Sequence, residues 1–233
     1  GVLTRVTGMI LSARGVRAPL GAYCEVMAEE GEGIVCEVVG FRDGEVMLMP
    51  LSAVQGLLPG TAVRVLTLTA RVGVGAGLLG RVVDGLGEPL DGGPSIVPDV
   101  FVPLRGERKN PLHRAAITAP LDVGVRAINT FLTVGRGQRI GLIAGSGVGK
   151  SMLLGMMTRF TEADVIVIGM IGERGREVLD FVHETLGEEG LKRSVVIAAP
   201  GDRSPVVRLR ATHYSCAVAE YFRDQGKNVL LLM

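Results

Sequence analysis

The segment Arg139–Ser151 reads Arg-Ile-Gly-Leu-Ile-Ala-Gly-Ser-Gly-Val-Gly-Lys-Ser. It is an apolar run, then a glycine-rich loop, then a Lys-Ser pair that opens a helical stretch. In such a loop, consecutive backbone N–H groups converge on the phosphates of a nucleotide, and the glycines permit the turn because a Cβ would be strained at several positions. The segment therefore predicts a strand over Arg139–Ala144, a phosphate-binding loop, and a helix over Ser151–Phe160.

The residues of this loop have distinct expected roles. Lys150 would neutralise the β- and γ-phosphates, and Ser151 would supply an oxygen ligand to Mg²⁺. The N-terminus of the following helix adds positive potential at the same anions. The strict pattern begins with Gly, whereas this chain has Ala144. The predicted phosphate cradle consists of Ala144, Gly145, Ser146, Gly147, Val148, Gly149, Lys150 and Ser151.

The composition is that of a globular chain with an aliphatic core. The 233 residues are 47% apolar but only 4% aromatic, with no Trp, so Val, Leu, Ile and Met must fill the interior. A net charge of +1 predicts no general nucleic-acid-binding surface. Cys24, Cys36 and Cys216 lack metal-ligand spacing and are expected to be reduced, buried thiols. No run of about 18 apolar residues occurs, so we expect no transmembrane helix.

Residues 1–72 read as a small β-barrel domain. Short apolar runs at 33–40, 45–49 and 62–68 are separated by turns, and Asp43-Gly44 is a strong hairpin signal between two of them. Several closely spaced strands favour a barrel. The domain carries no visible chemistry, so we interpret it as a structural or assembly module.

Residues 73–120 are rich in Gly and Pro and predict an ordered connector. A flexible linker is the alternative, but the alternating apolar residues favour packing on the core.

From residue 121 to 233 the pattern alternates between strands and helices, which predicts an α/β core with ligands at the carboxyl ends of its strands. Asp122 is expected to cap a short helix that runs to Phe131. A helix of about 18 residues should bury Val207, Ala211, Val218 and Phe222 on one face and end at Gly226. The other expected elements are strands at 164–172, 194–199 and 228–233 and a helix at 177–186.

A second chemical element, Gly172-Glu-Arg-Gly-Arg-Glu177, follows the strand after the phosphate loop. Hydrolysis of a γ-phosphate needs a group that orients and polarises the attacking water, and Glu173 is the first residue out of the strand. Arg174 and Arg176 could contact phosphate or hold Glu173. From position alone, a catalytic carboxylate and a solvated charged turn remain equally open.

The two elements together resemble the rotary ATPase superfamily, and more narrowly the ATPases of type III protein export in flagella and injectisomes. The narrower resemblance is carried by Leu132-Thr-Val-Gly-Arg-Gly-Gln-Arg-Ile-Gly-Leu142, by the loop 144–151, by Leu154-Gly-Met-Met157 and by Glu220-Tyr-Phe-Arg-Asp-Gln-Gly226. It extends over essentially the whole chain, including Gly80-Arg-Val-Val-Asp-Gly-Leu-Gly-Glu-Pro-Leu-Asp-Gly92.

The resemblance implies a fold, a reaction and a set of site residues. The fold would be a small N-terminal all-β barrel followed by an α/β P-loop (RecA-like) nucleotide-binding core. The cofactors would be ATP and Mg²⁺. Lys150 and Ser151 would hold phosphates and Mg²⁺, Glu173 would be the catalytic carboxylate, and Arg174 would support it. Non-catalytic relatives carry Gln at the carboxylate position, so Glu173 favours a catalytic subunit.

The resemblance also implies partners and a location. We expect a homo-hexamer with sites between subunits, regulator and stalk proteins, export substrates and their chaperones, and no nucleic acid. The expected location is the bacterial cytoplasm, peripheral to the inner-membrane export apparatus and touching the membrane only through the export gate. The loop 144–151 and Leu154-Gly-Met-Met157 favour a flagellar over an injectisome system.

Several family features are not found in the sequence, namely the Asp expected directly after Leu230-Leu-Leu-Met233, the arginine supplied by a neighbouring subunit, the adenine pocket, the C-terminal helical domain and the regulator-binding segment. We therefore expect the chain to comprise the N-terminal domain and about half of an ATPase core, incomplete at the C-terminus. By itself this part is expected to be inactive.

Three alternatives remain open. The first is a catalytic subunit of a rotary ATP synthase, and the second is a non-enzymatic, nucleotide-dependent assembly module. The third is a hexameric RNA translocase. Residues 1–72 count against it, because their six arginines are balanced by seven acidic residues and their aromatic residues are only Tyr23 and Phe41.

Overall fold

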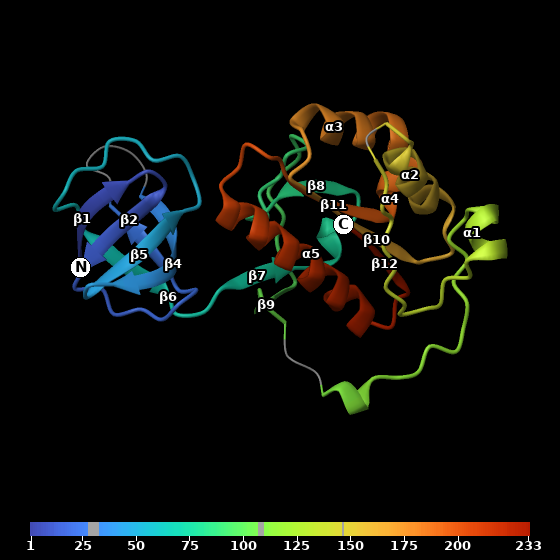
Figure 1. Cartoon of the computed structure of the whole chain (residues 1–233), viewed down its shortest axis with the longest axis horizontal. Helices are drawn as coiled ribbons and strands as arrows, with labels where there is room; N and C mark the ends of the chain where they lie inside the picture. The colour runs from blue at the N-terminus through green and yellow to red at the C-terminus, as the bar shows by residue number, and fades with distance from the viewer. Residues whose placement is uncertain (28–32, 107–109, 146) are drawn as a thin grey trace. The chain divides into compact units, whose positions relative to one another are not determined.

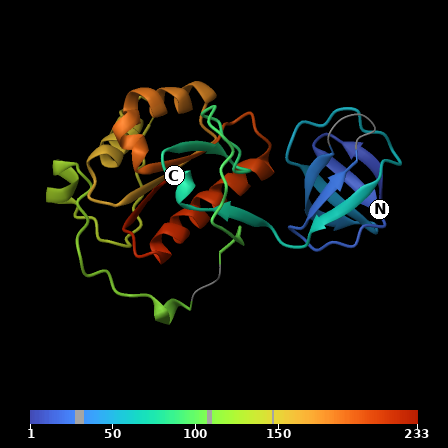
Figure 2. The same cartoon turned by 180° about the vertical axis from the view of Figure 1, so that it is seen from behind.

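The computed structural model describes residues 1–27, 33–106, 110–145 and 147–233. The chain divides into two compact units, Gly1–Arg71 with Arg203–Leu209, and Val72–Asp202 with Arg210–Met233. Figures 1 and 2 show their elements from opposite sides. Each unit is described separately below.

The first unit is built on a six-stranded antiparallel sheet in the order β1-β2-β5-β4-β3-β6. The sheet closes on itself because Val2 of β1 pairs with Ala62, just before β6, and the Leu3 N–H donates to the Thr61 carbonyl at 2.8 Å. Closure removes the exposed sheet edges and confirms the predicted barrel. The strands are β1 Val2–Thr7, β2 Ile10–Arg14, β3 Tyr23–Val26, β4 Ile34–Arg42, β5 Glu45–Pro50 and β6 Val63–Thr67.

The barrel interior is filled by alternate residues of these strands, as the period of two requires. The predicted hairpin between β4 and β5 is present, with both Asp43 (φ 51°) and Gly44 (φ 77°) in the left-handed region. Cys24 lies opposite Cys36 in the β3–β4 register; both are buried free thiols, and burial raises the pKa of Cys36 to about 12. Cys216, in contrast, is only partly buried.

The second unit contains a parallel sheet in the order β12-β10-β11-β8. Its strands are β8 Arg81–Asp84, β10 Val165–Ile171, β11 Ser194–Ala199 and β12 Val229–Leu232. The near-continuous apolar runs of β10 and β11 are buried, as expected for parallel strands covered on both faces.

Helices cover both faces of this sheet. On one face, Ile166, Ile168 and Val196 pack with Phe181 and Leu186. The other face is covered by the long helix that contains Ser215. Gly169 of β10 lies so close to it that an added Cβ would be 2.9 Å from the Ser215 hydroxyl oxygen. The arrangement is the predicted α/β core. The helical segments are α2 Lys150–Phe160, α3 Gly175–Asp180, the π-helical η3 Phe181–Leu186, α4 Gly187–Lys192 and α5 Pro205–Asp224 (Figure 1).

The segment interpreted as a connector contributes more than packing. β8 lies within 73–120 and pairs in parallel with β11, so this segment supplies one strand of the core sheet. It also contains η1 Ala76–Leu78, β9 Val100–Pro103 and η2 Pro111–His113, and β9 pairs with β7 Arg71–Val74.

The strand predicted over Arg139–Ala144 is wrong for this structure. These residues have no regular secondary structure and are exposed. Within the described residues no strand pairs with them, and an extended segment without a partner cannot satisfy the backbone groups that define a strand. The local pattern favours a strand, but no strand among the described residues pairs with this segment.

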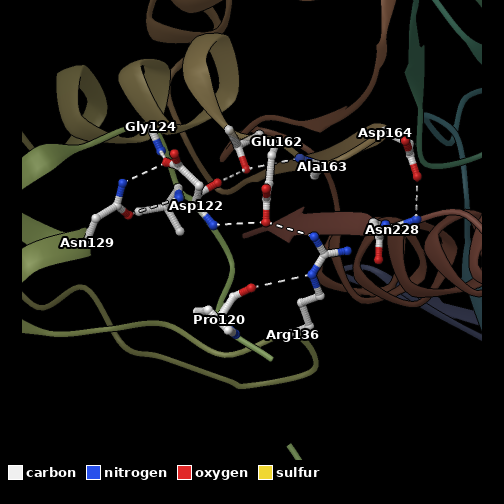
Figure 3. A network of polar contacts seen from close by, with 11 residues as sticks. Pro120, Asp122, Gly124, Asn129, Arg136, Glu162, Ala163, Asp164 and Asn228 are labelled. Atoms are coloured by element: carbon white, nitrogen blue, oxygen red, sulfur yellow. Dashed lines mark hydrogen bonds and ion pairs between the residues drawn. The ribbon is translucent and has the colours of Figure 1, made fainter. Parts of the chain in front are cut away.

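The predicted capping role of Asp122 is also wrong. The N-cap of α1 (Arg126–Phe131) is Val125, which makes no side-chain cap. The Asp122 carboxylate instead accepts from the Gly124 N–H and from the Asn129 side-chain amide, both at 2.6 Å (Figure 3). The Asp122 side chain therefore forms an Asx-type turn instead of an N-cap, because a short acidic side chain can accept hydrogen bonds in either arrangement.

The remaining helix predictions hold with changed boundaries. The expected helix 177–186 is present as α3 followed by the π-helical η3. Helix α5 buries Val207, Ala211, Val218 and Phe222 as predicted. It ends two residues before Gly226, whose φ is 81°. In the described part of the chain, no helix is both long and apolar enough to cross a membrane.

An ion pair fixes the turn after β8. Arg81 Nε and Nη2 donate to the two Asp91 carboxylate oxygens at 2.7 and 2.8 Å, and Asp91 also accepts from the N–H groups of Val82 and Gly93. The hydrogen bonds from Arg81 contribute most to lowering the pKa of Asp91 below its usual range. The carboxylate is therefore stabilised in its charged form by folding.

We expect Asp91→Asn to lower the free energy of unfolding by about 1–3 kcal/mol at neutral pH, since it weakens charge-assisted hydrogen bonds. Because the folded pKa is depressed, the contribution is complete above the unfolded pKa of about 4 and is lost as the pH falls from there toward the folded pKa. Urea unfolding of both proteins at neutral and acidic pH measures this. The exposed Glu88→Gln in the same turn is the control. An Asp91→Asn deficit that does not shrink in acid would contradict this account.

Candidate functional site

The glycine-rich loop leads directly into α2, which begins at Lys150. Gly147 (φ 75°) and Gly149 (φ 96°) adopt left-handed backbone conformations, which explains the need for glycine there. Gly149 is the N-cap of α2, and no side chain caps the helix. The first N–H groups of α2 are therefore available to an anion, as at phosphate-binding helix termini.

The loop itself is open to solvent. Ala144, Gly145, Val148 and Gly149 are exposed, and a Cβ at Gly145 would meet no atom within 4 Å. Ser146, one of the predicted cradle residues, lies outside the described residues. The structure thus leaves open space beside Gly145, Gly147 and Gly149.

A cavity of ≈ 180 Å³ lies at the start of α2. It brings together three predicted site residues, Lys150, Ser151 and Glu173. They come from different elements, because Lys150 and Ser151 open α2 while Glu173 follows β10. The rest of the wall combines two acidic residues with mainly apolar ones and consists of Leu154, Ile168, Gly169, Met170, Glu177, Asp180, Phe181, Thr185, Leu232 and Met233.

The backbone of Glu173 is held by the neighbouring strand. Its carbonyl accepts from the Gly201 N–H at 3.0 Å, and the preceding Gly172 N–H donates to the Ala199 carbonyl at 2.8 Å. Gly172 has φ 81°, which turns the chain out of β10. The carboxyl end of β10 thus presents Glu173 at the edge where ligands of open α/β sheets bind.

The charge state of Glu173 depends on its neighbours. A hydrogen bond with the Glu177 carboxyl group raises the pKa of Glu173, and burial and the negative charge of Glu177 raise it further. The positive charge of Lys150 acts in the opposite direction. A carboxyl group with a raised pKa is better matched to proton transfer near neutral pH than an ordinary one.

Arg174 does not line the cavity. It is the N-cap residue of α3, its side chain is 88% exposed, and Nη1 lies 3.6 Å from a Glu177 oxygen. Arg174 therefore contacts Glu177, which contacts Glu173, and any support for Glu173 is indirect in this structure.

Glu177 and Asp180 were not predicted as site residues, yet both line the cavity. A signal was present for Glu177, because it stands four residues after Glu173 in the same charged motif. Glu177 lies in the first turn of α3, which begins two residues after Glu173, so the two carboxyl groups are close in the chain and in space.

The oxygen donors around the cavity suit a hard cation. The Ser151 hydroxyl and the Glu173 carboxylate line the same cavity, and Mg²⁺ prefers oxygen ligands with one or two protein carboxylates and substrate phosphates. Among the described residues, no cluster of three or more His, Cys, Asp or Glu side chains could hold a metal ion alone. The donor set thus fits an ion that is completed by phosphate and water.

Two family models match the chain. Residues 124–233 match the nucleotide-binding domain of the ATP synthase alpha/beta family, and residues 3–66 match its beta-barrel domain. The matches agree with the α/β core and the closed barrel described above.

Curated relatives share sequence over the entire chain. A flagellum-specific ATP synthase of Pseudomonas aeruginosa is 56% identical over 100% of this chain and 52% of its own length. A type 3 secretion system ATPase of Xanthomonas euvesicatoria is 45% identical over 100% of this chain and 53% of its own length. The chain thus spans about half the length of the curated relatives it matches.

A solved structure is similar in fold as well. It is the assembled ATPase EscN in complex with its central stalk EscO, from the type III secretion system of enteropathogenic E. coli. The TM-score is 0.90 with 40% identity, over 99% of this chain and 56% of that one. By its two domain matches and these relatives, the chain belongs to the ATP synthase alpha/beta family, on the branch of the flagellar and type III secretion ATPases.

Proposed function

We propose that this chain provides the ATP-binding and hydrolysing site of an ATPase that energises type III protein export. The observation that carries the proposal is that Lys150, Ser151 and Glu173 line the same cavity. A phosphate-neutralising cation, a hydroxyl ligand for Mg²⁺ and a carboxylate in one place are the parts that phosphoryl transfer to water requires.

Each residue has a proposed role in this reaction. Ala144–Ser151 cradle the phosphates, with Lys150 neutralising the β- and γ-oxygens and Ser151 holding Mg²⁺. The Glu173 carboxylate accepts a hydrogen bond from the attacking water and orients it toward the γ-phosphorus. Arg174 supports Glu173 through Glu177. When bound, Mg²⁺ would reduce the charge of the β- and γ-phosphate oxygens.

The flagellar system is favoured over the injectisome. The support is the 56% identity to the flagellum-specific ATP synthase of Pseudomonas aeruginosa, while other flagellar relatives range down to 43% and the type 3 secretion system ATPase of Xanthomonas euvesicatoria is at 45%. On this proposal the protein acts in the bacterial cytoplasm at the inner-membrane export apparatus, on export substrates delivered by chaperones.

We further propose a homo-hexamer that contacts stalk and regulator proteins. The support is that EscN was solved as an assembled ATPase and with its central stalk EscO. Sites between subunits are also consistent with the exposure of residues 144–145 and 147–149.

The test is Mg²⁺-dependent ATP hydrolysis by the protein expressed from its complete gene. Specific activity is expected to rise steeply with protein concentration, because sites shared between subunits form only on assembly. An RNA-stimulated rate would favour a translocase instead. Absence of turnover at every concentration, with ATP still bound, would overturn hydrolysis and leave a nucleotide-dependent assembly module.

A further inference from the structure

Arg193 makes an unusual set of contacts at the far end of the phosphate-binding helix. It stands between α4 and β11, and its guanidinium donates to four main-chain carbonyls. Nη2 donates to Thr158 and Arg159 at 2.9 and 3.0 Å, and Nη1 donates to Thr161 and Ala163 at 3.0 and 2.9 Å. All four carbonyls belong to the last turn of α2 or to the turn that follows it.

These contacts provide hydrogen-bond donors to carbonyl groups at the end of a helix. The last carbonyls of a helix have no partner within the helix and carry the negative end of its dipole. Thr158 and Thr161 are buried, so their carbonyl groups have little access to water. The planar, forked guanidinium can serve four acceptors at once, which the compact ammonium of Lys cannot reproduce.

The same turn is also held by a second segment of the chain. The Asp122 carbonyl accepts from the Thr161 hydroxyl at 2.9 Å and from the Glu162 N–H at 3.0 Å. Glu162 Oε1 accepts from Arg136 Nη2 at 2.8 Å, and Figure 3 shows Arg136, Glu162 and Asp122 converging there. Arg193 and the Asp122–Arg136 segment therefore both hold the turn.

The opposite end of α2 carries Lys150 and Ser151, which are both exposed. The described residues of the preceding loop are exposed, and a Cβ at Gly147 or Gly149 would meet nothing within 4 Å. An 11-residue helix is about 16 Å long, so a small tilt about its held end moves the phosphate-binding residues appreciably.

The turn that Arg193 contacts also connects α2 to β10, at whose other end Glu173 lies. Together with the packing of Leu154 and Met157 along the helix, the direction in which α2 leaves this turn therefore contributes to the separation of Lys150 from Glu173 across the cavity. A displacement of about 1 Å at a reacting centre can cost up to about a hundredfold in rate.

We propose that Arg193 is a positioning residue for ATP hydrolysis, holding the distal end of α2 so that Lys150 and Ser151 meet the phosphates in register with Glu173. This inference rests on the proposed function for its catalytic consequence. Its consequence for nucleotide binding can be measured independently of hydrolysis.

The test compares Arg193→Lys and Arg193→Gln with the parent, all expressed from the complete gene. Lys192→Gln is the matched control, because Lys192 is the adjacent cation but its side chain is 67% exposed and pairs on the surface with Glu189. Circular dichroism and thermal unfolding report folding. Binding of a fluorescent ATP analogue with Mg²⁺ gives Kd, and steady-state hydrolysis separates KM from kcat.

We expect Arg193→Lys to raise Kd and KM for Mg-ATP about tenfold at a temperature where the protein remains folded, with Lys192→Gln unchanged. Arg193→Gln should have the larger effect, and Arg193→Lys should recover part of it. A merely structural role predicts a lower folded fraction, hence lower kcat at unchanged Kd and KM. That result, or a Kd equal to that of the control in the folded Arg193→Lys protein, would overturn the proposal. If the parent binds ATP without hydrolysing it, the proposed function fails, while the Kd comparison still decides the role of Arg193.

Discussion

Replacing Glu173 by Gln is expected to reduce ATP turnover by about 10³-fold while leaving nucleotide affinity within a few-fold of the parent. The amide keeps the size of the carboxylate and lines the same cavity. It cannot accept a proton from the attacking water, and general-base catalysis contributes about 10²–10⁴-fold. Steady-state phosphate release and the Kd of a fluorescent ATP analogue measure the two effects separately.

The matched control is Glu184→Gln, the same substitution at an exposed position of η3 that does not line the cavity. It should retain parental turnover, whereas normal turnover in Glu173→Gln would refute the catalytic assignment.

Because the pKa of Glu173 is raised mainly by Glu177, parental activity should decline with acid at a higher pH than for an ordinary Glu. In Glu177→Gln, which removes the neighbouring acid, the acidic limb should move to lower pH.

Lys150→Ala is expected to impair nucleotide binding, the step before hydrolysis, and to weaken Mg-ATP binding about 10–100-fold. Lys150 opens α2 and lines the cavity with Ser151, so its ammonium is placed beside the expected phosphates. Loss of a hydrogen bond to a charged group costs about 1.5–3 kcal/mol, which corresponds to this range of affinity. Titration of the fluorescent ATP analogue into both proteins gives the two Kd values.

Lys227→Ala is the control for loss of positive charge, because Lys227 is exposed beyond the end of α5 and does not line this cavity. Both proteins should retain the parental unfolding temperature, since each side chain removed lies at the surface. Equal affinity in Lys150→Ala and Lys227→Ala would mean that the nucleotide binds elsewhere.

Elements with a strong local pattern could be predicted from the sequence. The buried run of β10, the four-residue and seven-residue spacings of α5 and the Asp43-Gly44 turn each carry their own signal. Such signals depend on neighbours in the sequence, which the sequence displays directly.

β8 and Arg139–Ala144 show why the remainder could not be predicted. β8 has four residues in a Gly- and Pro-rich stretch, and it is a strand because β11 pairs with it. Arg139–Ala144 has the stronger strand pattern, yet no described strand pairs with it. Strand formation depends on a partner that is distant in sequence, so tertiary pairing overrides local propensity.

In the candidate site, too, some residues could be predicted from the sequence and others could not. Lys150, Ser151 and Glu173 stand in motifs whose spacing is tied to phosphate chemistry. Arg193 has no motif, because the carbonyls it contacts lie 30–35 residues earlier in the chain. Only the folded arrangement identifies it.

The most direct test of the account is the identity of the nucleotide that remains on the protein after incubation with Mg-ATP and removal of free ligand. Chromatography of the released nucleotide should find mainly ADP from the parent and intact ATP from Glu173→Gln, because the cavity would still bind the substrate but lack the group that activates water. ADP formed by Glu173→Gln at the parental rate would contradict a hydrolytic site built from the phosphate loop and Glu173.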